Sequence, residues 1–290
     1  MNHNTIFAVI GGDSRQIHMA KQLQKDGCRV SMSAFDLAQL PPFLQNKPLA
    51  EALSVANVVI FPLPLSRDAK LLNASFSKES ISLHSVIQLI RPDSLVFCGM
   101  PPAFFEKTLG AHDIRVIDYF KDEELTLQNA LLTAEGVIGI LTDRLPCTVF
   151  GLRCAVTGYG RVAKYTARAL QALGADVTIF ARSNEALTTA KCDRFKAFPL
   201  QNLQQQINDL QCVINTVPAL VIDEKSILQS DPDCVFIEVA SVPFGIDQTA
   251  AHKHGRTLIK AVSLPGKTAP KTAGEIIAKT IENYLTEGSS

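Results

Sequence analysis

The sequence has no excess of charge of either sign. Lys and Arg together number 28, as do Asp and Glu, so the formal net charge at pH 7 is zero. A general nucleic-acid-binding protein needs a positive surplus to neutralise phosphates, so the balance argues against that class. No apolar run approaches the roughly 18 residues of a membrane span. The first residues contain no basic, apolar leader. We therefore expect a cytoplasmic protein with no membrane role, and a homo-oligomer stays open.

The sequence also has no cysteine or histidine pattern typical of a metal site. Its seven cysteines are scattered, odd in number and without a C-x-x-C pair, which favours neither a disulfide framework nor a zinc site. Most of them lie in apolar runs, where a thiol acts as a small hydrophobe. No set of His, Asp and Glu has metal-ligand spacing. We expect reduced cysteines and no metal.

Short β-branched runs alternate with longer helical stretches along the whole chain. This alternation predicts parallel sheets covered by helices. At 290 residues and 47% hydrophobic content, the chain is long enough for two domains with their own cores. The expected strands are 6–10, 29–32, 58–61, 95–98 and 114–117 in the first half, and 153–157, 177–180, 213–215, 235–239 and 257–260 in the second.

The predicted fold is therefore α/β, with two doubly wound parallel-sheet domains. Residues 1–121 form an N-terminal flavodoxin- or Rossmann-like substrate domain, and 122–147 form a connecting helix and joint. Residues 148–264 form a Rossmann domain that binds NADP. Residues 265–290 form a C-terminal loop and helix that return to the first domain, which would leave a cleft between the domains.

The strongest motif is the glycine turn after the strand at 153–157, with G-x-G-x-x-A spacing. Gly158 makes the tight turn, Gly160 lets a pyrophosphate approach the backbone, and Ala163 lets helix and strand pack closely. Arg161 and Val162 begin the helix, whose first amides suit phosphate. Because the motif follows a strand and opens a helix, it predicts a dinucleotide site.

The residues after the strand at 177–180 indicate which dinucleotide binds. NAD specificity usually rests on an acidic residue at this strand end, and this chain has Arg182 and Ser183 instead. Arg182 suits a 2′-phosphate through a charge-assisted contact, with Ser183 as an added donor. Asp176 is acidic but lies at the opposite end of the strand. We predict NADP, with NAD possible; the alternative is that Arg182 is a solvated surface residue.

Two later loops end strands at the same carboxyl edge, where ligands bind in open sheets. Either loop could also be an ordinary turn. The cofactor residues expected from them are Asn215, Thr216, Val217, Pro218, Ala240 and Ser241.

Other candidates belong to the expected substrate site. Arg15 follows Gly11-Gly12 at a helix start, where helix amides and a guanidinium suit a carboxylate, or where the residues merely cap a helix. Glu135 flanks the apolar face of the connecting helix and is a candidate acid/base group, or a solvated residue. Lys271 is the preferred anion anchor, and the alternative is a capped linker. The further substrate-binding candidates are Ser66, Arg67, Lys267, Thr268 and Thr272.

These motifs together resemble the dipicolinate synthase A-subunit family across essentially the whole chain. The resemblance is carried by Ile10–Gln16, Thr133–Gly136, Gly158–Arg161, Ile214–Pro218 and Leu264–Gly274. It implies a spore-forming bacterium, action in the mother cell, and a partner, the dipicolinate synthase B-subunit, similar to flavin-containing decarboxylases. The implied reaction is the oxidation of dihydrodipicolinate, from the lysine/diaminopimelate pathway, to pyridine-2,6-dicarboxylate with NADP⁺ as hydride acceptor. That makes it an oxidoreductase acting on a CH–CH bond. Glu135 would take the proton, and cationic residues would clamp the dicarboxylate.

Two other functions stay open from the sequence. One is a two-domain NAD(P)-dependent dehydrogenase of another small carboxylic acid. The other is a nucleotide-binding scaffold that recruits the partner without catalysis.

Overall fold

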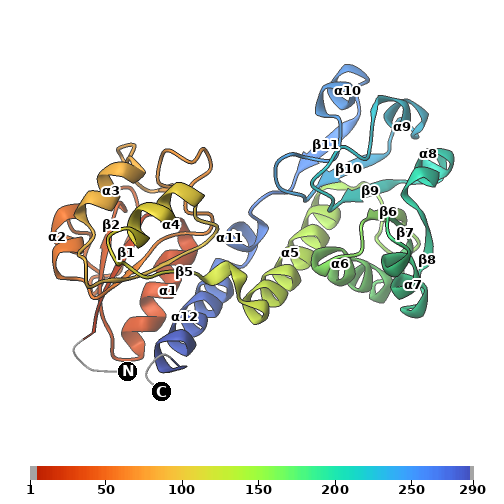
Figure 1. Cartoon of the computed structure of the whole chain (residues 1–290). Coiled ribbons are helices and arrows are strands. Elements are labelled where there is room, and N and C mark those ends of the chain that lie inside the picture. Colours follow the sequence, from red (N-terminus) through yellow and green to blue (C-terminus); the bar gives the residue numbers. More distant parts are fainter. Residues whose placement is uncertain (1–4, 288–290) are drawn as a thin grey trace. The chain divides into compact units, whose positions relative to one another are not determined.

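The computed structural model describes residues 5–287 and divides them into two compact units (Figure 1). The first unit comprises the residues up to Gln128 together with those from Ala269 onward, and the second comprises Asn129–Thr268. The division lies inside helix α5 (Glu123–Arg144) rather than at either end of it.

The first unit is built on a five-stranded parallel sheet in the order β2-β1-β3-β4-β5. The strands are β1 (Ile6–Ile10), β2 (Arg29–Ser33), β3 (Val58–Ile60), β4 (Leu95–Cys98) and β5 (Val116–Asp118). The helices are α1 (Ser14–Lys25), α2 (Leu49–Val55), α3 (Leu83–Leu89), α4 (Ala103–Gly110), the short 3-10 helix η1 (Tyr119–Lys121) and the C-terminal α12 (Pro270–Glu287).

Alternation along β1 directs side chains to two separate cores. Phe7 and Val9 pack with α1 and α12, whereas Ala8 and Ile10 pack with α2, α3 and α4. Helices therefore cover both faces of this sheet, as in a doubly wound fold. The close approach of α12 to α1 depends on Gly274, because a Cβ there would collide with the Arg15 carbonyl oxygen and lie 2.8 Å from the Met19 nitrogen.

The second unit is built on a six-stranded parallel sheet in the order β11-β10-β9-β6-β7-β8. Read from β8, this is the 3-2-1-4-5-6 order of a Rossmann domain. The strands are β6 (Arg153–Thr157), β7 (Asp176–Ala181), β8 (Lys196–Pro199), β9 (Cys212–Asn215), β10 (Val235–Glu238) and β11 (Thr257–Lys260). The helices are α6 (Arg161–Ala172), α7 (Asn184–Cys192), α8 (Leu203–Gln206), α9 (Glu224–Gln229), α10 (Gln248–Lys253) and α11 (Leu264–Thr268), with 3-10 helices η2 (Leu200–Asn202) and η3 (Ile207–Asp209).

The predicted fold class of two doubly wound parallel-sheet domains is confirmed by these two sheets. One expected segment is wrong: the C-terminal loop expected to begin at residue 265 is helical, with α11 followed by α12 after a single residue, Ala269. Pro265 and Pro270 each lie in a first helical turn, where a missing N–H costs no hydrogen bond. Strand β8 is not predicted by the pattern, because this edge strand buries only Ala197 and ends at Pro199.

Helix α5 is the one helix within residues 5–287 that is long and apolar enough to cross a membrane by length and composition. Its Val137 and Leu141 are fully buried in the core of the second unit, so part of its apolar surface is used in packing within the protein.

The seven cysteines form no disulfide bond. Burial raises the pKa of Cys154 and of Cys234 to about 12, so both thiols stay protonated and serve as core residues. Cys147 and Cys192 are exposed.

Candidate functional site

The turn between β6 and α6 has the conformation that the glycine motif requires. Gly158 has φ +80°, and a Cβ there would lie 3.0 Å from both Thr216 Oγ1 and Val217 Cγ2. An L side chain would thus be strained by its backbone angle and crowded by its neighbours. Helix α6 begins immediately after Gly160, which occupies the N-cap without a side-chain hydrogen bond to the first turn. The first amides of α6 therefore have no side-chain acceptor at the cap and suit an anion.

The residues that follow take three different positions on α6. Arg161 is exposed, Val162 is half-buried, and Ala163 is fully buried in the core of the second unit. The small Ala163 side chain lets α6 approach β6 closely.

A hollow of about 620 Å³ opens beside this turn. It lies at the carboxyl ends of the strands, and its volume is within the roughly 300–1,000 Å³ of small-molecule sites. It is lined by Gly158, Tyr159, Gly160, Lys164, Ala181, Arg182, Ser183, Glu185, Ala186, Thr189, Leu200, Val217, Ala219, Leu220 and Val221. The structure thus gathers Gly158, Gly160, Arg182, Ser183 and Val217, predicted from separate motifs, around one space.

Arg182 and Ser183 follow directly on β7. Arg182 is exposed, and its side chain makes no hydrogen bond or ion pair with any residue in 5–287. Ser183 is the N-cap of α7, where its Oγ accepts from the Ala186 N–H at 3.2 Å, and its own O–H can still donate. Asp176 lies at the amino end of β7 and pairs with Lys196 at 2.9 Å. The acidic residue that does line the hollow is Glu185.

Behind the hollow lies a buried polar network that the sequence analysis missed. Glu238, at the end of β10, is 0% exposed. Its carboxylate accepts from Asn215 Nδ2 at 2.6 Å, from the Ala240 N–H at 3.1 Å, and from the Gly245 and Ile246 N–H groups at 2.9 Å each. Acceptance of four hydrogen bonds compensates for burying the charge. The only sequence signal is an acidic residue that ends an apolar strand.

The network continues through Asn215 to the turn at β6. Asn215 is also 0% exposed; its Oδ1 accepts from the Thr157 hydroxyl at 2.5 Å and from the Val217 N–H at 3.1 Å. Thr216 Oγ1 donates to the Thr157 carbonyl at 2.7 Å. Asn215 and Thr216 therefore hold the ends of β6, β9 and β10 together, and Val217 is the member of this loop that lines the hollow.

The remaining residues predicted from these two loops do not line the hollow. Pro218 and Ser241 are exposed, and Ala240 is buried with its N–H on Glu238. Gly245 links the loops, because its carbonyl accepts from the Val221 and Ile222 N–H groups at 2.9 Å each. The position of Val221 at the hollow thus depends on Glu238 through Gly245.

In the first unit, Arg15 is buried rather than presented to solvent, at 4% exposure. Its Nε and Nη2 donate to the Asp13 carboxylate at 2.9 Å, and Nη2 donates to the Leu63 carbonyl at 2.6 Å. Burial acts to raise the pKa of Asp13, but the hydrogen bond and charge of Arg15 outweigh it, so this pKa lies below its ordinary value. The start of α1 is closed by a capping box between Asp13 and Gln16, so the amides there have acceptors within the chain.

Ser66 and Arg67 lie in the loop after β3. Ser66 Oγ donates to the Leu71 carbonyl at 2.6 Å and contacts Asp68 Oδ1 at 3.0 Å. Arg67 is exposed at a hollow of about 340 Å³ formed with the segment Leu71–Ser75. Its positive charge contributes to the lowered pKa of Asp13.

The other predicted substrate residues divide between the units. Lys271 and Thr272 are exposed in the first turn of α12, and Lys271 Nζ lies 4.0 Å from Glu275 Oε1. Glu135 and Lys267 are exposed in the second unit. Thr268 Oγ1, on α11, donates to the Leu264 carbonyl at 2.9 Å.

Comparison with known proteins gives consistent relatives. Residues 6–120 match the family described as the N-terminal domain of the dipicolinate synthase A-subunit. The dipicolinate synthase A-subunit of Bacillus subtilis (strain 168) is 27% identical over 288 residues, covering 97% of this chain and 96% of that protein. The crystal structure of the dipicolinate synthase A-subunit from Bacillus halodurans superposes with a TM-score of 0.86 and 26% identity, covering 97% of this chain and 98% of that chain.

A transhydrogenase from Sinorhizobium meliloti shares the fold, with a TM-score of 0.69 at 15% identity over 96% of this chain and 93% of that one. The predicted resemblance is confirmed: residues 6–120 match the family of the N-terminal domain of the dipicolinate synthase A-subunit, and the chain as a whole is similar to that protein.

Proposed function

We propose that the second unit binds NADP in the hollow beside Gly158. The observation that carries this proposal is the glycine turn leading into the start of α6, next to a hollow lined by Arg182, whose side chain has no partner among residues 5–287. The turn and the α6 amides would hold the pyrophosphate. Arg182 and Ser183 would hold the 2′-phosphate, because a guanidinium and a hydroxyl both donate to phosphate oxygens.

The space around Gly160 gives independent support for a dinucleotide at this turn. A Cβ on Gly160 would meet no atom within 4 Å, so the backbone at the start of α6 is open to a ligand. Gly158, in contrast, is crowded by Thr216 and Val217 from the neighbouring strand end. One glycine shapes the turn, and the other leaves room for the phosphates.

For the reaction, we propose oxidation of dihydrodipicolinate to pyridine-2,6-dicarboxylate. The substrate loses two hydrogens, one as a hydride and one as a proton, and the ring becomes aromatic. The nicotinamide, when bound, supplies the hydride acceptor. Glu135 would accept the proton through its exposed carboxylate. Because aromatisation is downhill, holding the substrate in position would account for much of the catalysis.

The two carboxylates of the substrate require cationic partners, and the exposed candidates are Lys271, Arg67 and Lys267. Thr272 would add a hydroxyl. For Arg15 and Ser66 we propose supporting roles, since both are hydrogen-bonded within the chain. Arg15 would hold the loop at Leu63 and thereby the segment that leads to Arg67.

We further propose that the chain acts in the cytoplasm of a sporulating cell together with a dipicolinate synthase B-subunit. The support is the similarity to proteins named as the A-subunit of that enzyme, because such a name implies a partner. A small dicarboxylate would be the substrate, and neither nucleic acid nor membrane would be a ligand.

The test is to follow reduced nicotinamide formation by the purified chain, with freshly generated dihydrodipicolinate, with NADP⁺ or NAD⁺, and with or without the B-subunit. Turnover by this chain with NADP⁺ is expected. Turnover that appears only with the B-subunit would make the complex the catalyst. Tight NADP⁺ binding without turnover in either case would favour a scaffold.

The variant Lys271→Ala should lower turnover while leaving dinucleotide binding unchanged, and Lys279→Ala on the same helix is its matched control. Equal turnover of both variants would remove Lys271 from the substrate site.

A further inference from the structure

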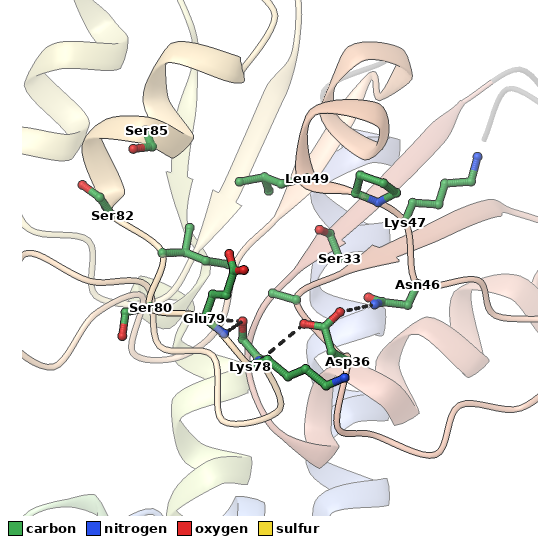
Figure 2. Close-up of a pocket in the computed structure, with 14 residues that line it drawn as sticks. Ser33, Asp36, Asn46, Lys47, Leu49, Lys78, Glu79, Ser80, Ser82 and Ser85 are labelled. Carbon is green, nitrogen blue, oxygen red and sulfur yellow. Dashed lines mark hydrogen bonds between the residues drawn. The ribbon is translucent and has the colours of Figure 1, made fainter.

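The first unit contains a hollow of its own, at the carboxyl end of β2 (Figure 2). Its volume is about 590 Å³, within the range of small-molecule sites. Its walls come from the residues just after β2, the segment Asn46–Leu49 that leads into α2, and the segment Ser77–Ser85 around the start of α3. None of these residues belongs to the NADP hollow or to the predicted substrate set.

A buried hydroxyl faces this hollow. Ser33, the last residue of β2, is 2% exposed, and its hydroxyl makes no hydrogen bond with any residue of the described chain, 5–287. It lines the hollow, and its hydroxyl points into it (Figure 2). A serine hydroxyl can both donate and accept a hydrogen bond. The Ser33 hydroxyl is therefore available to a ligand that enters the hollow.

The carboxylate of Asp36 faces the same space and is fixed from behind. Oδ1 accepts from Asn46 Nδ2 at 3.0 Å, and Oδ2 accepts from the Lys78 N–H at 3.4 Å. A carboxylate has about four acceptor positions, so both oxygens can still accept from a ligand. The geometry suits a pair of neighbouring hydroxyl groups, which is how an acidic residue after the second strand binds a ribose in dinucleotide folds.

The charges around the hollow balance. Lys47 and Lys78 are matched by Asp36 and Glu79, and Lys47 is already paired with Glu51 at 2.8 Å. An anion would gain little in such a setting. The hollow is also lined by the apolar residues Ala34, Pro48, Leu49 and Ile81. A neutral ligand with hydroxyl groups on one side and a flat apolar ring on the other fits this mixed lining.

The place where a phosphate would follow the ribose is filled. In dinucleotide domains the pyrophosphate lies at the first glycine turn. Here Leu72 and Ala74 lie against that turn, because a Cβ on Gly11 would be 2.9 Å from Leu72 and 3.2 Å from Ala74. The amides at the start of α1 are engaged in the capping box. The first unit thus has the ribose half of a nucleotide site without its phosphate half.

We propose that this hollow binds a nucleoside. The ribose hydroxyls donate to Asp36 and accept from Ser33, and the base packs on the apolar residues Leu49 and Ile81. The site is separate from the NADP hollow and does not depend on the proposed function of the second unit.

The test is calorimetric titration of adenosine into the full-length protein, with and without saturating NADP⁺. Adenosine is expected to bind equally in both conditions, because NADP⁺ occupies the other unit. AMP is expected to bind no more tightly than adenosine, since its phosphate finds no donors. Uridine and ribose distinguish recognition of the base from recognition of the sugar alone.

Asp36→Asn should weaken adenosine binding about tenfold or more, since a hydrogen bond to a charged group is lost. Ser33→Ala should weaken it by a smaller factor. Asp113→Asn is the matched control, as an exposed acid of the same unit that does not line the hollow. Because Asp36 is exposed, its variant should fold normally, and an unchanged melting temperature checks this.

Three results would overturn the proposal. The first is no binding of any nucleoside at millimolar concentration. The second is displacement of adenosine by NADP⁺, which would place it in the second unit. The third is equal binding by Asp36→Asn and the control.

Discussion

Asn215 and Glu238, on neighbouring strands β9 and β10, are joined by a 2.6 Å hydrogen bond in a fully buried position. The amide of Asn215 donates to the carboxylate of Glu238. The first residue orients the loop at Val217, and the second orients the loop at Gly245. The wall of the hollow beside Gly158 is therefore held in place from behind by the buried Glu238 carboxylate.

Glu238→Gln should destabilise the protein by about 2–4 kcal/mol, because one acceptor oxygen becomes a donor facing N–H groups. It should also weaken NADP⁺ binding, since Val217 and Val221 lose their support. Urea unfolding measures the first effect and calorimetry the second. Glu51→Gln, an exposed substitution of the same kind, is the control. Unchanged stability in Glu238→Gln would show that the hydrogen bonds of the Glu238 carboxylate do not support the two loops.

Gly158→Ala should lower dinucleotide affinity at least about tenfold, because the methyl group meets Thr216 and Val217 while φ is +80°. Gly255→Ala is a close control: Gly255 also has a positive φ, of +64°, but nothing lies within 4 Å of its Cβ position. Both variants should lose about 1 kcal/mol of stability from backbone strain. Only the first should lose NADP⁺ binding, and equal affinity for the two would show that the turn is not part of the site.

Arg182→Ala should reduce the preference for NADP⁺ over NAD⁺ by about tenfold or more, as one charge-assisted contact with the 2′-phosphate is lost. The effect should appear in the KM or dissociation constant for NADP⁺ and leave that for NAD⁺ nearly unchanged. Glu185→Gln is the informative partner, because Glu185 is the acidic residue in the same hollow. If Glu185→Gln weakens NAD⁺ binding and Arg182→Ala changes nothing, the cofactor is NAD.

Asp13→Asn should remove a pH-dependent part of the stability. The pKa of Asp13 in the folded protein lies below its ordinary value, so its ionised form stabilises the fold above the unfolded pKa, and this contribution is lost as pH falls through the folded pKa. The difference in unfolding free energy between the wild type and Asp13→Asn should stay constant from neutral pH to about pH 5 and shrink below about pH 4. Urea unfolding at several pH values measures it. A difference that grows on acidification would contradict the assignment.

The strand pattern of this fold is readable from the sequence because buried parallel strands leave short apolar runs. β1, β4, β6 and β11 coincide with their predicted bounds, as each is bounded by turn residues. β5 begins two residues later than predicted, because Ile114 is buried against the end of α4 and is not paired in the sheet. Strand β8 leaves a weaker pattern, because it buries only Ala197 and ends at Pro199.

The site was less predictable, because a sequence motif does not tell which way a side chain faces. The motif at Asn215 correctly marks a strand end, yet the amide turns inward to Glu238 instead of toward the hollow. Arg15 looks like a free cation in the sequence, and its partner Asp13 is only two residues away. The role of Glu238 depends on backbone N–H groups seven and eight residues further along the chain, which no local spacing reveals.

The first sheet shares its core with a helix from the far end of the chain. Ile277, Ala278 and Ile281 of α12 are buried with Phe7 and Val9 of β1, although the whole second unit lies between them in the sequence. During synthesis on the ribosome, all strands of the second unit are therefore made before α12, and only then can the first unit bury the face of its sheet that carries Phe7 and Val9. We expect the nascent first unit to expose an apolar surface over α1 until α12 emerges, which makes that interval the one in which the protein most needs a chaperone.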